Sequence, residues 1–214
     1  MFINVLPENG EPVLALLTEH GVTEDFYMAG GTAAALQLGH RRSYDLDFFT
    51  PKEFGTTPLI QKLSSIGEFK LTGEAEGTVH GILKGVRVSF MFYRYPLLFP
   101  TSDFHGVRIA DLRDIGLMKI TAISSRGSKK DFVDLYVICQ RVIPLESLLG
   151  LFEAKYSGTG YSLYHLLRSL AYFDDAEREP ALETLGEGTT WSEVKAYFRK
   201  EQTRLFERYR PPAT

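Results

Sequence analysis

The hydrophobic pattern of this chain changes type near Asp111, and no other feature constrains the fold as strongly. Before this point, short apolar runs typical of strands alternate with helical patterns; after it, every pattern is helical. We therefore expect an α+β fold, with a small mixed sheet and its helices in residues 1–110 and a helical half in residues 111–214. The helices of the second half are expected at 111–125, 129–141, 145–156, 162–173 and from about 190 to 208.

The first half contains all of the expected strands. Residues 68–93 follow a period of two, and Lys84-Gly85 predicts a tight hairpin turn within them. On the second strand of this hairpin, Arg87 and Ser89 point away from the apolar side. The expected strands are 26–29, 45–49, 78–83, 86–93 and 107–110, and the expected helices are 11–20, 33–38 and 56–66.

The composition is that of a globular protein, and it excludes several classes. The 214 residues are 44% hydrophobic, and their net charge of −3 excludes a globally basic nucleic-acid binder, although not a local basic patch. The single cysteine, Cys139, excludes an internal disulfide and a zinc site built from several thiolates. No apolar run approaches a membrane span of about 20 residues, and the N-terminus lacks a signal-peptide pattern. We expect a cytoplasmic protein with no membrane partner.

A glycine turn lies between the strand at 26–29 and the following helix. Glycine lets the backbone approach a phosphate closely, and a helix N-terminus offers N–H groups that no helical carbonyl accepts. Gly30 and Gly31 therefore fit a phosphate-binding turn, and the Thr32 hydroxyl fits a helix cap or a phosphate donor. Arg41 and Arg42 could neutralise phosphate charge.

An acidic strand follows within 16 residues of the glycine turn. Asp45 and Asp47 are two residues apart on an expected strand, so both carboxylates point to one face. Two carboxylates held this close repel each other unless a cation lies between them, and Mg²⁺ or Mn²⁺ accepts such oxygen ligands together with substrate phosphates. A glycine turn alone is usually only a turn, and a lone aspartate is usually a surface charge. The two features in this order favour a metal and nucleotide site.

A second cluster of charges lies in the helical half. Lys119 falls on an apolar helical stripe, and Asp131 and Asp134 share one face of the next helix. The short connection makes these helices antiparallel neighbours, so Lys119 could approach either aspartate. On spacing alone, a structural salt bridge and a functional group are equally good interpretations.

These motifs resemble the polymerase-beta-like nucleotidyltransferase superfamily, in which a glycine and a Ser or Thr precede two metal-binding aspartates on a strand. Residues 26–50 are similar to the AbiEii/AbiGii toxin-type branch, and residues 119–136 match its K-x-x-A-x-x-x-R and K/R-D-x-x-D-L-Y helices. The resemblance implies a nucleotidyltransferase core followed by a helical domain that completes the active-site cleft. It implies roles for Gly30, Gly31, Thr32 and Arg42 on the triphosphate, Asp45 and Asp47 on metal, Lys119 on phosphates, Asp131 as base, and Asp134 among the substrate-binding residues, orienting Lys119 or Arg126.

The implied reaction moves a nucleoside monophosphate from an NTP to a hydroxyl, on the 3′ end of a tRNA or on a protein side chain. A toxin of this branch also implies a cognate antitoxin. Many superfamily members carry a third carboxylate on a later strand, where this chain has Ser89. Either Asp131 supplies the base, or the enzyme works without a third strand carboxylate, or the chain is a catalytically silent nucleotide-binding or interaction protein. A phosphohydrolase using the same metal pair is a weaker alternative.

Three basic residues recur on one face of the last expected helix: Lys200, Arg204 and Arg208. An exposed face that pairs with Glu201 and Glu207 is the favoured interpretation, and an RNA backbone contact is the alternative.

Overall fold

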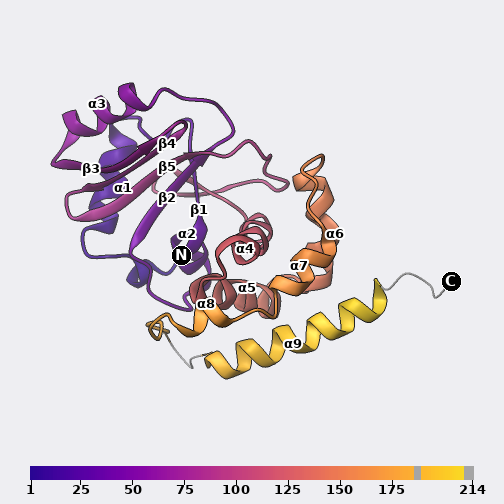
Figure 1. The fold of residues 1–214 in the computed structure, drawn as a ribbon. Coiled ribbons are helices and arrows are strands. Elements are labelled where there is room, and N and C mark those ends of the chain that lie inside the picture. Colours follow the sequence, from indigo (N-terminus) through magenta and orange to yellow (C-terminus); the bar gives the residue numbers. More distant parts are fainter. Residues whose placement is uncertain (186–188, 210–214) are drawn as a thin grey trace. The chain divides into compact units, whose positions relative to one another are not determined.

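The structure, a computed structural model, describes residues 1–185 and 189–209. The chain divides into two units, Met1–Asp111 and Leu112–Thr214. The first contains every sheet strand of the described chain, and the second is built on helices (Figure 1). The predicted α+β class and the change of pattern near Asp111 are both present in the structure.

The first unit is built on a seven-stranded mixed sheet with the order β3-β4-β5-β2-β1-β7-β6. Its α2 helix packs against β1 and β2, and α3 packs against β3 and β4. The elements of this unit are η1 (Ile3–Val5), α1 (Gly10–Glu19), β1 (Tyr27–Ala29), α2 (Gly30–Leu38), β2 (Asp45–Thr50), α3 (Thr56–Ile66), β3 (Phe69–Ala75), β4 (Thr78–Leu83), β5 (Val86–Phe92), β6 (Ser102–Phe104) and β7 (Val107–Ile109).

The acidic strand β2 lies in the middle of this sheet, antiparallel to β1 and parallel to β5. Its residues alternate between partly exposed and fully buried, as the period of a pleated strand requires. Leu46 and Phe48 have no exposed surface, and the Phe48 ring stacks on Phe90 with centroids 5.0 Å apart. Asp45 and Asp47 consequently share the other face, as predicted.

Helix α2 begins three residues earlier than the sequence suggested. Ala29 is its N-cap, so the two glycines form the first turn of the helix. Gly30 has a φ of 75°, a left-handed conformation that glycine adopts without strain. The helix ends at a second left-handed glycine, Gly39.

The hairpin predicted around Lys84-Gly85 is present, with both turn residues at positive φ. Two further strands carry too little signal to be specified from the sequence. Strand β3 lies within the stretch of period two at 68–93, but it is an edge strand with mostly exposed side chains, so the apolar contrast is too weak to set its bounds. Strand β6 has only three residues and pairs with β7 across a turn at His105 and Gly106.

The second unit packs its helices around α4, which contacts α5, α6 and α7, while α9 contacts α5 and α7. Phe132 lies in an aromatic cluster with Phe173, Trp191 and Phe198. Thr190 and Glu193 form a reciprocal capping box that fixes the start of the last helix. The elements are α4 (Leu112–Arg126), α5 (Lys129–Arg141), α6 (Leu145–Tyr156), α7 (Leu163–Ser169), α8 (Asp174–Glu177) and α9 (Trp191–Arg208).

The helix expected over residues 162–173 is shorter than predicted. It ends at Ser169, and α8 begins separately at Asp174. The amides of Ala171 and Tyr172 bond to carbonyls three residues back, which tightens the backbone and ends the α-helix. The turn directs Phe173 into the aromatic cluster of the core.

No single helix of the described chain is long and apolar enough to cross a membrane. Helices α5 and α6 together have the length and apolar composition of a membrane span, but the pair is bent by 110°.

Candidate functional site

The two aspartates of β2 are held by their strand neighbours. Asp45 lies opposite Arg87 of β5 in the sheet register, and the Arg87 guanidinium donates to Asp45 Oδ1. This ion pair is partly exposed, with 29% of the Asp45 side chain accessible. Asp47 lies between Ala29 of β1 and Ser89 of β5. Arg87 therefore supplies a cation that offsets the repulsion between the two carboxylates.

The glycine turn lies directly against the acidic strand. A Cβ atom on Gly30 would be 2.9 Å from Asp47 Oδ2, which is closer than Cβ atoms lie to other heavy atoms in proteins. A Cβ atom on Gly31 would collide with the guanidinium of Arg41. Both glycines are thus needed for close approach, one toward a carboxylate and one toward a cation.

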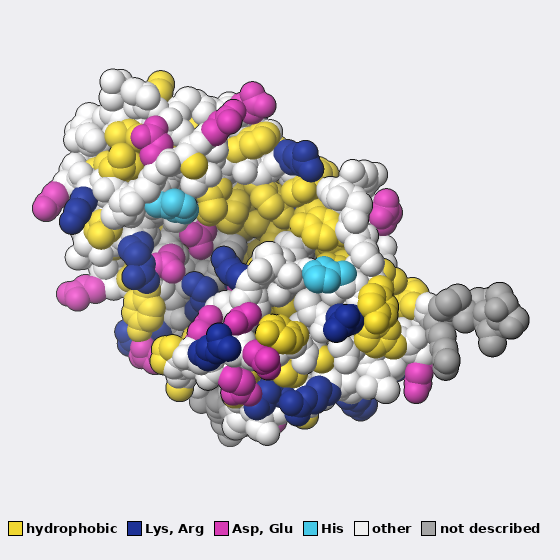
Figure 2. All heavy atoms as spheres, viewed as in Figure 1, with side chains coloured by type: hydrophobic (Ala, Val, Ile, Leu, Met, Phe, Trp, Pro, Cys, Tyr) yellow, Lys and Arg dark blue, Asp and Glu magenta, His cyan; other side chains and the backbone are white. Residues whose placement is uncertain are grey.

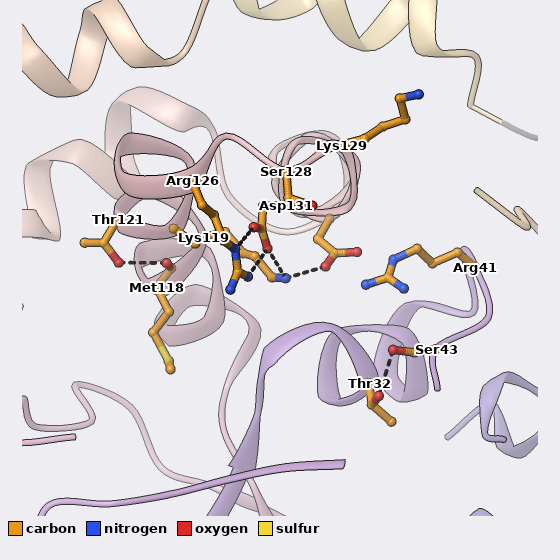
Figure 3. A network of polar contacts seen from close by, with 12 residues as sticks. Thr32, Arg41, Ser43, Met118, Lys119, Thr121, Arg126, Ser128, Lys129 and Asp131 are labelled. Atoms are coloured by element: carbon orange, nitrogen blue, oxygen red, sulfur yellow. Dashed lines mark hydrogen bonds and ion pairs between the residues drawn. The ribbon is translucent and has the colours of Figure 1, made fainter. Parts of the chain in front are cut away.

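Thr32 connects the glycine turn to the start of β2. Its hydroxyl lies 2.7 Å from the Ser43 hydroxyl and donates to the backbone carbonyl of Asp45. Figure 3 shows Thr32 and Ser43 pointing toward each other. Thr32 is only 1% exposed and does not cap α2, contrary to one of its predicted roles. In this structure its hydroxyl fixes the position of Asp45 instead.

The two arginines before β2 differ in environment. Arg41 is 4% exposed, lies beside Gly31 and donates from Nη1 to the Arg42 carbonyl at 2.8 Å. Arg42 has an exposed side chain. The sequence predicts that Arg41 and Arg42 neutralise phosphate charge, with Arg42 among the substrate-binding residues. The structure brings Arg41 to the glycine turn, and the role of Arg42 stays a prediction. The sequence cannot show which of these two adjacent arginines faces the turn, because that depends on the path of the backbone before β2.

Ser89 occupies the position beside Asp47 where a third carboxylate was considered. Its neighbour on the other side is His80 of β4, and Ser89 Oγ lies 3.0 Å from His80 Nδ1. Asp47, Ser89 and His80 therefore form one row across three strands. The sequence pattern gave no signal for His80, because the pairing of β4 with β5 decides which residue it faces.

The carboxylates of β2 fit a hard divalent cation. Among the described residues, no group of three or more His, Cys, Asp or Glu side chains could hold a metal ion by itself. Mg²⁺ is commonly bound through one or two carboxylates while water and substrate phosphates complete its coordination. Asp45 and Asp47 match that donor set, and the bare Gly30 leaves the space beside Asp47 Oδ2 free of a side chain.

The predicted approach of Lys119 to the two aspartates of α5 is confirmed. Lys119 Nζ lies 2.8 Å from Asp131 Oδ1 and 2.6 Å from Asp134 Oδ2. Arg126 forms a fork on Asp131, with Nε 2.7 Å from Oδ2 and Nη2 3.0 Å from Oδ1. Figure 3 shows Lys119 and Arg126 converging from α4 on Asp131 of α5. The two aspartates are fully buried, whereas the Arg126 side chain is 59% exposed.

The charge state of Asp131 follows from these contacts. Burial works to raise the pKa of its carboxyl group, but Lys119 and Arg126 outweigh burial and hold the pKa below its usual value. Asp131 is therefore ionised near neutral pH, and both of its oxygens are occupied by cations. A carboxylate in this state accepts a proton reluctantly.

The basic face of α9 is largely paired. Arg204 contacts Glu201 and Glu146, and Arg208 contacts Glu146. The ion-paired interpretation of this face is correct for these two arginines, although the main partner is Glu146 of α6 rather than Glu207. Figure 2 shows acidic and basic side chains interspersed over the helical unit.

Comparison with known proteins shows which family the chain belongs to. It is 37% identical over 186 residues to the Aquifex aeolicus (strain VF5) protein aq_aa25, covering 85% of this chain and 88% of that one. The chain belongs to the family of that Aquifex protein. The name of the relative assigns no activity, so membership alone carries no substrate. No protein-family model matches the chain.

Solved structures of other proteins show which known fold this chain shares. MenT4, a nucleotidyltransferase toxin of Mycobacterium tuberculosis H37Rv, matches with a TM-score of 0.57 and 15% identity, over 94% of this chain and 88% of that one. JHP933 of Helicobacter pylori matches with a TM-score of 0.50 and 16% identity, over 94% of this chain and 93% of that one. The chain is similar to these proteins in fold, and the predicted nucleotidyltransferase fold is confirmed.

Proposed function

We propose that this protein is a metal-dependent nucleotidyltransferase that moves a nucleoside monophosphate from an NTP to a hydroxyl acceptor. The observation that carries the proposal is the glycine turn held directly against the two-aspartate strand, on a nucleotidyltransferase fold. Two partly exposed carboxylates on one face of a central strand, beside a helix N-terminus, are the donors that a metal-bound triphosphate requires.

In this reaction the acceptor hydroxyl gives its proton to solvent and its oxygen forms a bond to the α-phosphorus. The bond between that phosphorus and the bridging oxygen breaks, and pyrophosphate leaves. Gly30 and Gly31 offer backbone N–H groups at the N-terminus of α2 to the phosphates. Asp45 and Asp47 would hold Mg²⁺ or Mn²⁺, which supplies charge neutralisation and activation of the attacking oxygen. Lys119 would bind phosphates as a point charge.

We assign Asp131 a positioning role on Lys119 rather than the role of general base. Its two oxygens already accept from Lys119 and Arg126, and its pKa is lowered by those cations. Replacement of Asp131 by Asn should therefore raise the KM for NTP and leave the shape of the pH–rate profile unchanged. Loss of the ascending limb of that profile in the variant would instead identify Asp131 as the base.

We propose a biological setting from the similarity of the chain to toxin-type enzymes. A toxin of a toxin–antitoxin or abortive-infection system acts in the cytoplasm on a tRNA 3′ end or a protein side chain, and a cognate antitoxin opposes it. Support for this setting comes from residues 26–50 and 119–136, which resemble AbiEii/AbiGii-type enzymes, and from the fold that the chain shares with MenT4.

The test is transfer of label from each α-labelled NTP to total tRNA or to lysate protein, in the presence of Mg²⁺. Asp47→Asn should abolish transfer, because it removes one of two charged metal ligands. Asp25→Asn is the matched control, since Asp25 is an exposed carboxylate of the same unit that pairs with Lys52. This control should transfer label at the parent rate.

Other outcomes identify the alternatives. Full activity in Asp47→Asn would remove Asp47 from the metal site. Absence of transfer to any acceptor, with intact NTP binding, would make the chain a silent nucleotide-binding protein. Release of phosphate or nucleoside monophosphate without an acceptor would indicate a phosphohydrolase.

A further inference from the structure

The helical unit contains a pocket of its own, formed where the C-terminal end of α4 meets α7. Its volume is about 390 Å³, within the range of small-ligand sites. We call it the α4–α7 pocket. Its lining residues are Ile123, Ser124, Ser125, Arg126, Gly127, His165, Arg168, Ser169, Tyr172 and Asp175.

The pocket has a cationic side. Arg168 has an exposed guanidinium that lies 5.9 Å from the Tyr164 ring centroid, and no described carboxylate pairs with it. His165 lies one turn earlier on α7 and shares that helix face. The single carboxylate of the lining, Asp175, is exposed and lies 3.8 Å from Arg178. A guanidinium without a carboxylate partner is the group that binds phosphate in a two-pronged geometry.

The other walls supply hydroxyl groups and an aromatic ring. The Ser124 side chain has no hydrogen-bond partner among the described residues, so its hydroxyl can donate to an anion. Tyr172 is 53% exposed, and its ring can stack on a planar base. Figure 2 shows basic, histidine and hydrophobic side chains together on the surface over α7.

Arg126 belongs both to this pocket and to the cluster around Lys119. Arg126 lines the pocket while its guanidinium pairs with Asp131, and its side chain remains 59% exposed. A phosphate in the pocket would therefore lie beside Arg126. Arg126 contacts Asp131, and Asp131 in turn contacts Lys119.

We propose that the α4–α7 pocket binds a nucleotide unit, with its phosphate on Arg168 and Ser124 and its base on Tyr172. The unit can come from a free nucleotide or from a nucleic-acid strand, which share this chemistry. The site goes beyond the proposed reaction, because it lies wholly within the helical unit and its occupancy requires no metal.

The test is equilibrium binding of a short fluorescent single-stranded RNA to the full chain in EDTA, followed by anisotropy, with competition by ATP and by inorganic phosphate. Arg168→Gln should weaken binding about tenfold and reduce the slope of log K against log salt by about 0.7. Tyr172→Ala should weaken binding by about tenfold or more. Arg141→Gln removes one exposed positive charge of α5, outside the pocket lining, and should bind as the parent does.

Competition separates the two sources of the nucleotide. Displacement of the RNA by ATP, with equal losses for both ligands in the pocket variants, supports a free nucleotide. Loss of RNA binding alone supports a strand. The proposal is overturned if the parent binds neither ligand, if both pocket variants bind as tightly as the parent, or if Arg141→Gln weakens binding equally. Because EDTA prevents transfer, these results do not depend on whether the proposed reaction occurs.

Discussion

Replacement of Asp131 by Asn tests the buried charge cluster of the helical unit. The change keeps the size of the side chain and one carbonyl acceptor, but it removes the negative charge that Lys119 and Arg126 contact. We expect the variant to fold with lower stability, because Lys119 is only 4% exposed and cannot turn to water.

The size of the loss follows from what remains in place. Breaking a fully buried ion pair costs about 3–5 kcal/mol. Here Lys119 keeps Asp134 at 2.6 Å, and the 59%-exposed Arg126 side chain can be hydrated. The loss should therefore be close to the value of one hydrogen bond to a charged group, about 2 kcal/mol.

Urea unfolding measures this loss, and Trp191 is a suitable probe. It is the only tryptophan of the chain, and it packs on Phe132, the neighbour of Asp131 on α5. A loss of about 2 kcal/mol should lower the midpoint by about 1 M for a slope of about 2 kcal/mol/M. Glu153→Gln is the control, since it removes an exposed carboxylate on α6 and should leave the midpoint unchanged.

The pH dependence gives a second measurement. The pKa of Asp131 is lowered in the folded protein, because Lys119 and Arg126 outweigh the opposing effect of burial. Its stabilisation is thus complete above the unfolded pKa of about 3.9 and is lost as the pH falls through the lower folded pKa. The parent and Asp131→Asn should therefore converge in stability below about pH 4. A midpoint equal to that of the parent at pH 7, or a difference that persists unchanged into acid, would refute this account.

Three further results are expected. Asp114→Asn should cost about 3–5 kcal/mol in urea unfolding, because Asp114 and Lys155 are both fully buried and lie 2.7 Å apart; a cost below about 1 kcal/mol would contradict the burial of this pair. Burial raises the pKa of Cys139 to about 12, so a thiol reagent at pH 8 should modify the native protein far more slowly than the urea-unfolded chain, and equal rates would show that the thiol is accessible. Gly31→Ala should reduce nucleotidyl transfer by roughly tenfold to a hundredfold with unchanged circular dichroism, since its Cβ would displace the Arg41 guanidinium; parent-like transfer would show that this contact is dispensable.

Local patterns predicted the parts of the fold whose signal is contained in a short stretch. The helix over 56–66 was expected at its observed bounds, because its apolar spacing and Pro58 act locally. Strand β6 was missed, since three residues carry no period, and the break after Ser169 depends on how Phe173 packs in the core. Local periodicity cannot show an end that tertiary packing imposes.

The features of the candidate site also divide into those that local sequence predicts and those that depend on tertiary structure. The common face of Asp45 and Asp47 follows from strand period alone, and the meeting of Lys119 with Asp131 follows from a short helix connection. The pairing of Asp45 with Arg87 could not be predicted, because it requires the register between β2 and β5, which are separated in sequence by a helix and two strands. A one-residue shift of that register would place Arg87 on the other face.

The charge cluster of the helical unit bears on the proposed phosphate-binding role of Lys119. Lys119 with Asp131 and Asp134 alone would carry a net negative charge, which would repel a triphosphate. The fork of Arg126 on Asp131 brings these four groups to neutrality and occupies the oxygens that would otherwise compete for the ammonium. Arg126 is the one member of the cluster with a largely exposed side chain, so it is also the member that an anion from solvent can reach first. Ligands that approach Arg126 in the α4–α7 pocket would therefore change the contacts of Asp131, and through Asp131 those of Lys119, without contacting the lysine themselves.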